Sequence, residues 1–297
     1  MIDYNKITDI FCTIDEFCNN FKQNTESFIL GKKPKRPSIM SESEVICILM
    51  LFHLGGFRCL KHFYLFYVKQ HMQAEFPATV SYNRFVELSQ SILLPMTIFL
   101  KTCCLGTCTG ISFVDSTPIM VCKNKRIKRN KVFKGMAEVG KSTMGWFYGF
   151  KLHIVINDCG EILNFAITQA NVDDREPLRN EGFLKAVFGK LFADKGYISE
   201  QLTNILFVND IHLVTNIRNN MKNNLMTMSD KILLRKRSVI ETVNDELKNI
   251  CQIEHSRHRS FANFITNMVA GLIAYSFFPK KPAIKYQTTN STQLRAF

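Results

Sequence analysis

The sequence predicts an α/β protein, with a mixed five-stranded sheet flanked by helices and an N-terminal helical domain. Three observations predict this fold. Residues 1 to about 108 have helical patterns, and residues 111 to 169 contain three strand patterns in succession. Residues 170 to 217 then alternate helical patterns with two further strands. A run of strands followed by alternating helices and strands is typical of a mixed sheet with helices on its faces.

The helical domain is expected over residues 1–108. Its clearest signal is the capping-box spacing of Ser41 and Glu44, directly before the apolar run at 45–57. Three further helices are expected in this domain, at 58–72, 82–94 and 95–104. A small helical domain of this kind can contain a helix-turn-helix, although no feature selects one helix as the reader of DNA.

The sheet is expected within a second domain, residues 109–280, followed by a polar tail at 281–297. Residues 146–156 alternate strongly, with Trp146 on one face and Lys151 and His153 on the other. The five expected strands are 111–115, 146–156, 161–169, 190–194 and 211–217. The expected helices of this domain are NVDDREPL running to about 188, then 199–208, 228–250 and 261–278.

The last of these segments tests for a membrane span. Residues 261–278 carry no charge over a length at the threshold for spanning. Asn263 and Asn267 interrupt the apolar character, and no second such segment exists, so we expect a buried core helix and no membrane partner. The N-terminal sequence lacks the apolar region of a signal peptide. We therefore expect reduced cysteines and a location in the bacterial cytoplasm, in association with the nucleoid.

Positive charge is concentrated directly after the first strand. The chain has a formal net charge of +13, and Glu138 is the only carboxylate between Ser116 and Asn157. The cations of this basic segment are Lys123, Lys125, Arg126, Lys128, Arg129, Lys131 and Lys134. Excess positive charge indicates an anionic partner, either nucleic acid or an anionic membrane surface. The alternative for the segment is a solvated, disordered loop.

Three acidic residues are candidates for a reactive centre. Asp115 and Asp194 each end an apolar strand, where side chains project from the edge of an α/β sheet. Glu241 shares one helical face with Arg237 and Lys248, which are four residues before it and seven after it. The alternatives are aspartates that form turns or cap helices, and a solvated surface helix with salt bridges.

If the three carboxylates converge, each pair repels by roughly 3 kcal/mol at about 5 Å and an effective dielectric near 20. A cation would relieve this repulsion. Hard oxygen ligands favour Mg²⁺ or Mn²⁺, and two such ions can promote cleavage of a phosphodiester. A zinc site at Cys251, His255 and His258 is a weaker alternative, because a fourth ligand is missing from the sequence pattern.

Six blocks of the chain resemble the DDE transposases of bacterial insertion sequences. Four blocks carry the general resemblance: FVDSTPI, WFYGFKLHIVINDCGEI, FADKGYIS and RKRSVIETVNDELK. Two others resemble the insertion-sequence 982-type family in particular: SESEVICILMLFHLGGFRCLKHFYLFYV and IEHSRHRSFANFITNMVAGLIAY. Together they span roughly residues 40 to 278, in the order and spacing of the family.

The resemblance implies an RNase H-like catalytic domain, with Asp115, Asp194 and Glu241 as the metal-binding catalytic acids. Related transposases have a Tyr-x2-Arg-x3-Glu-x6-Lys signature, which Arg237, Glu241 and Lys248 match. Leu234 stands where the tyrosine would be. The family's chemistry is hydrolysis of a DNA strand followed by attack of a 3′-hydroxyl.

The expected partners follow from the resemblance and from the charge. They are double-stranded DNA, both the terminal inverted repeats and the target, and a second copy of the chain. Arg237, Lys248, Lys151 and His153 are candidates for contacts to DNA beside the basic segment, although His153 also fits a hydrogen-bonded histidine within a sheet. The alternatives to a transposase are an inactive transposase-derived repressor and a structure-directed nuclease.

Overall fold

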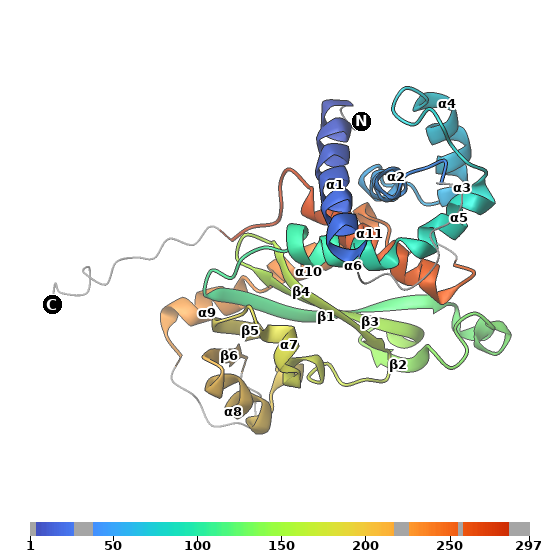
Figure 1. The fold of residues 1–297 in the computed structure, drawn as a ribbon. Helices are drawn as coiled ribbons and strands as arrows, with labels where there is room; N and C mark the ends of the chain where they lie inside the picture. The colour runs from blue at the N-terminus through green and yellow to red at the C-terminus, as the bar shows by residue number, and fades with distance from the viewer. Residues whose placement is uncertain (1–3, 27–37, 217–225, 255–257, 285–297) are drawn as a thin grey trace.

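The computed structural model describes residues 4–26, 38–216, 226–254 and 258–284. Its N-terminal part is helical, as the sequence predicts (Figure 1). The elements are α1 (Tyr4–Thr25), α2 (Glu42–Leu54), α3 (Leu60–His62), the π-helix η2 (Phe63–Val68), α4 (Lys69–His71), α5 (Tyr82–Ser91), α6 (Leu93–Phe99) and the π-helix η3 (Leu100–Cys104).

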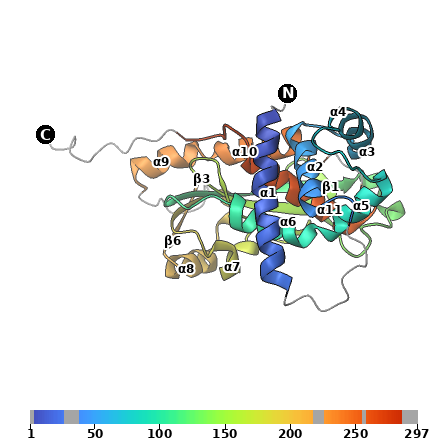
Figure 2. The ribbon, with the colours of Figure 1, turned by 45° about the horizontal axis from the view of Figure 1, so that its top comes forward.

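The helix α2 begins with the predicted capping box. The Ser41 hydroxyl accepts a hydrogen bond from the backbone N–H of Glu44, and the Glu44 carboxylate accepts one from the backbone N–H of Ser41. Residues 45–53 of this helix are all buried, so α2 lies within the core instead of on its surface. Helix α1 packs against α2 and α6 (Figure 2).

The second part of the chain forms one mixed sheet. Its strands are β1 (Ile111–Cys122), β2 (Glu138–Ser142), β3 (Gly145–Asn157), β4 (Ile162–Gln169), β5 (Gly189–Ala193) and β6 (Ile211–Thr215). The order is β2-β3-β1-β5-β6, with β4 also pairing with β3. The β1–β3 and β3–β4 pairs are antiparallel, whereas β5 pairs in parallel with both β1 and β6. This is the RNase H-like mixed sheet that the resemblance implied.

Two features of the sheet differ from the prediction. The first strand does not end at Asp115 but continues to Cys122, because β3 is long enough to pair with its whole second half. A sixth strand, β2, pairs with the first residues of β3 in a hairpin. The sequence EVGKS of β2 is short and polar, so it lacks the apolar alternation by which a strand is predicted.

The connections between the later strands are helical. They include the 3₁₀ helix η5 (Pro177–Arg179), α7 (Glu181–Leu184), the 3₁₀ helix η6 (Lys195–Tyr197) and α8 (Glu200–Val208). The prediction of one helix from NVDDREPL to about 188 is wrong. The Asp173 carboxylate accepts hydrogen bonds from the Arg175 backbone and guanidinium, which favours a turn, and Pro177 and Gly182 further limit helix length. Asp173 and Asp174 therefore do not cap a helix.

The predicted helix at 228–250 is divided into three parts. These are α9 (Met228–Arg235), α10 (Ser238–Asp245) and the π-helix η7 (Glu246–Ile250). The uncharged segment forms α11 (Phe261–Ser276), which is buried along most of its length, as expected of a core helix. Within the described parts of the chain, no helix has the length and apolar character needed to cross a membrane.

The two faces of the sheet are covered differently. Residues of α2, α6, α10 and α11 share one continuous hydrophobic core with one face of the sheet (Figure 1). A smaller core lies on the other face, under α7 and α8. All ten cysteines are free thiols. The N-terminal helices and the sheet are therefore joined by packing as well as by the chain.

Candidate active site

Asp115 and Asp194 lie next to each other on adjacent strands. The parallel register of β1 and β5 pairs Ile111 with Lys190 and Phe113 with Phe192. Continuing this register by two residues places Asp115 beside Asp194, directly after the last residue of β5. Beyond this point none of the described strands pairs in parallel with β1, so the two carboxylates stand where the parallel pairing of the sheet ends.

Glu241 reaches the same place from helix α10. One guanidinium nitrogen of Arg237 lies 3.2 Å from Glu241 Oε1 and 3.9 Å from Asp194 Oδ1. Glu241 Oε1 and Asp194 Oδ1 are therefore no farther from each other than the sum of these two distances. Half or more of the Asp194 and Glu241 side chains is exposed, at 55% and 58%, so both remain accessible to ions and to a substrate.

Asp115 is the most enclosed of the three acids. Its Oδ2 accepts a hydrogen bond of 3.2 Å from the side-chain amide of Asn244, a residue one turn after Glu241 on α10. Burial is the main reason that the pKa of Asp115 is raised to about 6; the carboxylates of Glu241 and Asp194 also raise it, while a backbone hydrogen bond from Ser116 and the charge of Arg237 lower it. The mutual repulsion expected of converging acids is thus present in the fold.

The π-helix η7, which follows α10, is fixed to β1 by Lys248 and by Glu254 just beyond it. Lys248 Nζ donates a hydrogen bond of 2.6 Å to the Pro118 carbonyl and lies 3.5 Å from Glu254 Oε2. The Glu254 carboxylate also accepts a bond from the backbone N–H of Met120. The π-helix η7 alters the helical spacing after Glu241, so Lys248 turns toward β1, whereas the straight-helix prediction placed it on the face of Arg237.

The structure does not bring Lys151 and His153 to the three acids. Asp115 is paired across the strands with Ile154, so Lys151 and His153 project from the opposite face of the sheet. Lys151 Nζ is bonded to Asp174 Oδ1 and to the Val172 carbonyl. His153 is buried and its Nε2 lies 2.8 Å from the Thr168 hydroxyl, which is the arrangement of a hydrogen-bonded sheet histidine. Burial lowers its pKa to about 4.

The basic segment is folded. Residues Asn124–Arg129 form a 3₁₀ helix, and all seven predicted cations from Lys123 to Lys134 are exposed. The segment is anchored by Phe133, whose ring packs edge-on against Phe150 and Phe264 and whose carbonyl accepts a bond from the Tyr148 hydroxyl. The segment therefore presents its charges from a fixed base at the far end of β1.

The three acids suit divalent cations by charge and by donor type. Carboxylate oxygens are hard ligands, and Asn244 Oδ1 beside them is a buried oxygen to which no described residue donates a hydrogen bond. The described residues nevertheless contain no group of three His, Cys, Asp or Glu side chains already close enough to hold a metal. The Arg237 guanidinium lies between Asp194 and Glu241, so a cation held by all three acids would compete with it. His255 of the alternative zinc site lies outside the described residues.

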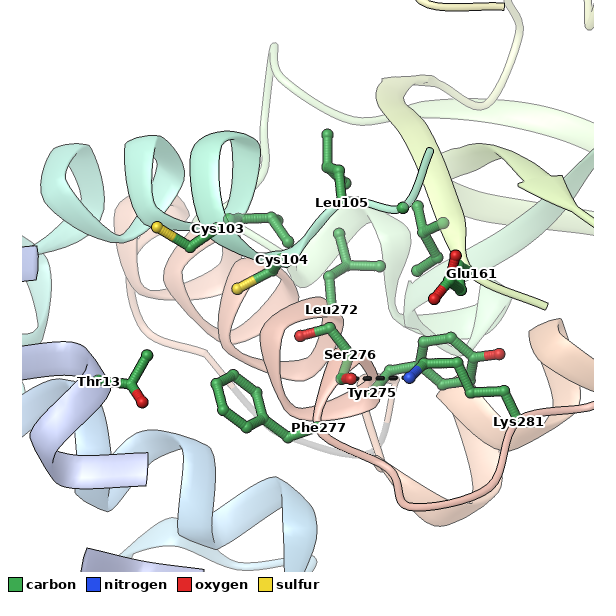
Figure 3. A pocket seen from close by; sticks show the side chains of 13 residues that line it. Thr13, Cys103, Cys104, Leu105, Glu161, Leu272, Tyr275, Ser276, Phe277 and Lys281 are labelled. Atoms are coloured by element: carbon green, nitrogen blue, oxygen red, sulfur yellow. Dashed lines mark hydrogen bonds between the residues drawn. The ribbon is translucent and has the colours of Figure 1, made fainter. Parts of the chain in front are cut away.

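One pocket of the structure lies away from the three acids. It has a volume of about 340 Å³ and lies where α1, η3 and the end of α11 meet the β3–β4 turn (Figure 3). Its one carboxylate, Glu161, accepts a hydrogen bond from Asn157, and Lys281 is bonded to the Ser276 carbonyl. Both charged side chains of this pocket are thus engaged in holding the fold, and its described lining contains no second acid.

Two residues near the acids were missed by the sequence analysis. Asn244 follows Glu241 by three residues, so helical spacing would have placed it on the same face. Tyr197 is buried three residues after Asp194, with its hydroxyl near the Ser116 side chain. Burial raises the pKa of Tyr197, and the charges of Asp115, Asp174 and Asp194 all raise it further. The Tyr197 side chain therefore lies between the acids and the loop at 170–174.

The comparison with protein families decides the class of the chain. The family described as "Transposase DDE domain" matches residues 105–261, which is more than half of the sequence. The chain belongs to this family. It is therefore a transposase of the DDE class. Proteins of this class act in DNA transposition and recombination. In general they are polynucleotidyl transferases that use divalent metal ions. The matched range of the transposase DDE domain contains all three acids and the basic segment.

Other comparisons add little to this assignment. Among solved structures, the "Crystal structure of the Mos1 Strand Transfer Complex" resembles the chain with 9% sequence identity and a TM-score of 0.24. The similarity covers 86% of this transposase and 83% of that chain. No curated protein matches the sequence.

Proposed function

We propose that the protein is a DNA transposase that cleaves and transfers DNA strands at the ends of an insertion sequence, using Mg²⁺ or Mn²⁺. The observation that carries this proposal is the convergence of Asp115, Asp194 and Glu241 from three separate elements where the parallel pairing of the sheet ends. A cluster of like charges destabilises the fold unless cations are bound, which favours a role beyond structure.

In this proposal Asp115, Asp194 and Glu241 hold the two divalent ions. Ions bound there supply Lewis-acid stabilisation of the attacking and leaving oxygens of a phosphodiester. Asn244 orients the Asp115 carboxylate, and the Lys248–Glu254 pair holds η7, which follows α10, against β1. We propose that Arg237, which pairs with Asp194 and Glu241 in the free protein, contacts the phosphate of the transferred strand once cations occupy the acids.

The rest of the chain has proposed roles in binding DNA. Residues 1–108 are proposed to bind the terminal repeats, residues 109–280 to form the catalytic domain, and residues 281–297 to be a tail. The insertion-sequence 982-type family fits the sequence blocks at 41–68 and 253–275. Since two DNA ends must meet in transposition, we propose a homodimer as the active form, acting in the bacterial cytoplasm.

Strand cleavage on the element's own ends tests the activity. Duplexes carrying these ends, taken from the DNA that flanks the gene, are incubated with the protein and with Mg²⁺, Mn²⁺ or EDTA. We expect nicks with either metal and none with EDTA, and Glu241→Gln is expected to reduce cleavage about a thousandfold, because a metal ligand supplies several kcal/mol. Binding of the ends without metal-dependent nicks would indicate a repressor instead, and cleavage independent of the end sequence would indicate a structure-directed nuclease.

The basic segment is expected to supply phosphate contacts. Replacing Lys125, Arg126 and Lys128 with Ala should weaken DNA binding similarly for all sequences. The dependence of log K on log salt should become shallower by up to about 0.9 for each cation removed. Fluorescence anisotropy at several salt concentrations measures both quantities.

The matched control for this experiment is Lys185→Ala, which removes an exposed cation beside α7. It should leave both the affinity and the salt dependence unchanged. An equal effect of Lys185→Ala, or an unchanged salt dependence in the triple variant, would show that the basic segment is not a specific contact surface.

A further inference from the structure

The exposed face of one N-terminal helix is not used in the mechanism above. Helix α3, the π-helix η2 and α4 follow one another without a break and form one helix from Leu60 to His71, which we call the outer helix. Both α3 and α4 lie on the outside of the helical domain, away from the sheet (Figure 1). The outer helix is therefore accessible to a large partner.

The outer helix is held to the core along one side. Phe63, Tyr64 and Val68 are fully buried. The Tyr64 hydroxyl donates a hydrogen bond of 2.8 Å to the Val80 carbonyl, and the Tyr64 ring stacks on Phe85 of α5 with 4.3 Å between the ring centres. The other side of the helix is thereby presented to solvent in a fixed orientation.

The charge of the outer helix suits an anionic partner. Residues 45–74 include no acid. Arg58 and Lys61, at the start of the helix, are exposed, and so is His71 at its end. A DNA duplex would therefore meet positive charge and no carboxylate along this helix.

The other helices of the N-terminal part are less suited to DNA. Residues 45–53 of α2 are buried, and α6 packs against both α1 and α11. Helix α1 exposes the carboxylates of Asp9 and Glu16. In α5, the Arg84 guanidinium is paired with Glu87 at 2.8 Å. The structure thus distinguishes the outer helix, which the sequence pattern did not.

The exposed face of the outer helix carries groups that can read bases. His62, Phe66 and Gln70 follow one another at intervals of four residues, and all three are exposed, Phe66 at 52%. The rings of His62 and Phe66 lie 5.0 Å apart, which shows that they are neighbours on this face. The major groove admits a helix, and there a glutamine amide pairs with adenine and a phenyl ring contacts the thymine methyl group. This face is therefore suited to A·T pairs.

The outer helix and the basic segment are attached to the same core. Phe133, at the base of the basic segment, packs edge-on against Phe264 of α11. Ser260, the N-cap of α11, accepts a hydrogen bond of 3.0 Å from Gln90 of α5, the helix that also packs against Tyr64. This connection favours contact of both surfaces with one DNA duplex.

We propose that the outer helix reads the terminal repeat in the major groove, with Phe66 on a thymine methyl group and Gln70 on an adenine. Arg58 and Lys61 contact phosphates beside them. The inference rests on the proposed function, since it requires that the protein bind the ends of an insertion sequence. Phosphate contacts position the protein on any DNA, whereas contacts to base edges select one sequence, so the two sets of side chains have separable effects.

Binding to two duplexes of equal length and base composition tests this proposal. One carries the terminal repeat, taken from the DNA that flanks the gene, and the other is a scrambled version of it. Fluorescence anisotropy in EDTA should show that the wild type prefers the terminal repeat. Phe66→Ala and Gln70→Ala should each reduce this preference about tenfold and leave the affinity for the scrambled duplex unchanged. Arg58→Ala should weaken binding of both duplexes equally.

A terminal repeat in which uracil replaces thymine tests the Phe66 contact alone. This replacement removes the methyl groups and keeps the base pairing. We expect the wild type to bind the uracil form more weakly than the thymine form. Phe66→Ala should bind the two forms equally, because the side chain that contacts the methyl group is absent.

Leu94→Ala is the matched control for Phe66→Ala, because Leu94 is an apolar side chain of α6 that is 63% exposed. It should change neither affinity. A preference for the terminal repeat that persists in both Phe66→Ala and Gln70→Ala would overturn this inference and leave the proposed function in place. Equal binding of the two duplexes by the wild type would also overturn it, and nicking of the terminal repeat after addition of Mg²⁺ then decides whether the proposed function stands.

Discussion

Asp115→Asn is expected to abolish strand cleavage and, in the same molecule, to make the free protein more stable. Asp115 is the enclosed member of the acid cluster, and the amide retains its shape but not its charge. Loss of a metal ligand should reduce cleavage by about a thousandfold or more, since several kcal/mol of transition-state stabilisation are removed. Cleavage of labelled end DNA in Mg²⁺ measures this loss.

The gain in stability follows from the raised pKa of Asp115. Its carboxyl holds a proton up to about pH 6 in the folded protein, whereas the unfolded chain releases it near the ordinary value of 3.8. The stabilisation of the folded state by the protonated Asp115 carboxyl is therefore fully present below pH 3.8 and is lost as the pH rises through about 6. At pH 7 the charged carboxylate destabilises the fold by up to about 3 kcal/mol, which Asn removes.

Thermal unfolding with and without divalent ions checks this explanation. In EDTA at pH 7, Asp115→Asn should unfold at a higher temperature than the wild type, and the difference should disappear near pH 4. Added Mn²⁺ should raise the unfolding temperature of the wild type but not that of the variant. A variant that is less stable than the wild type at pH 7 in EDTA would contradict the burial of a charged Asp115 beside two other carboxylates.

Ile273→Ala is expected to have the largest effect on stability. Ile273 is fully buried in α11, within the core that joins the N-terminal helices to the sheet. Truncation to alanine removes buried apolar surface and leaves a cavity, which should lower the free energy of unfolding by about 3 to 4 kcal/mol. The unfolding temperature should fall by about 5 to 10 °C.

The shared core also predicts how the protein unfolds. Hydrogen exchange should show equal losses of protection in α2 and in β3 of the Ile273→Ala variant, because both pack into the same cluster. Ile39→Ala is the control, since Ile39 is 71% exposed, and it should change stability little. Loss of protection confined to α2 would show that the N-terminal helices unfold separately from the sheet.

Much of the sheet could be predicted because its strands are apolar and regular. The five predicted strands correspond to β1, β3, β4, β5 and β6. The missed strand β2 and the second half of β1 have weak patterns of their own. They are strands because β3 offers them backbone partners, and pairing of this kind is a property of the folded neighbours that a local pattern does not contain.

For the candidate site, too, the sequence predicted what local patterns contain and missed what depends on tertiary contacts. The proximity of Asp115 and Asp194 follows from two apolar strands that each end in aspartate, which is a local signal. The positions of Lys151 and Lys248 depend on tertiary partners. Asp174 and the Pro118 carbonyl hold these ammonium groups away from the acids, and neither contact has a sequence signature. Tyr197 was missed for the same reason, since its surroundings come from three elements.

The unbroken length of β1 has a consequence for the DNA that the protein would cover. Asp115 lies on this strand, and Lys123 lies eight positions later, directly after its last residue. At about 3.3 Å for each residue, the distance between the two is at most about 26 Å. Duplex DNA rises about 3.4 Å for each base pair, so this interval matches about eight base pairs. The fold would thereby set a fixed distance along the DNA between the nucleotides bound by the basic segment and the phosphodiester bond that is cleaved.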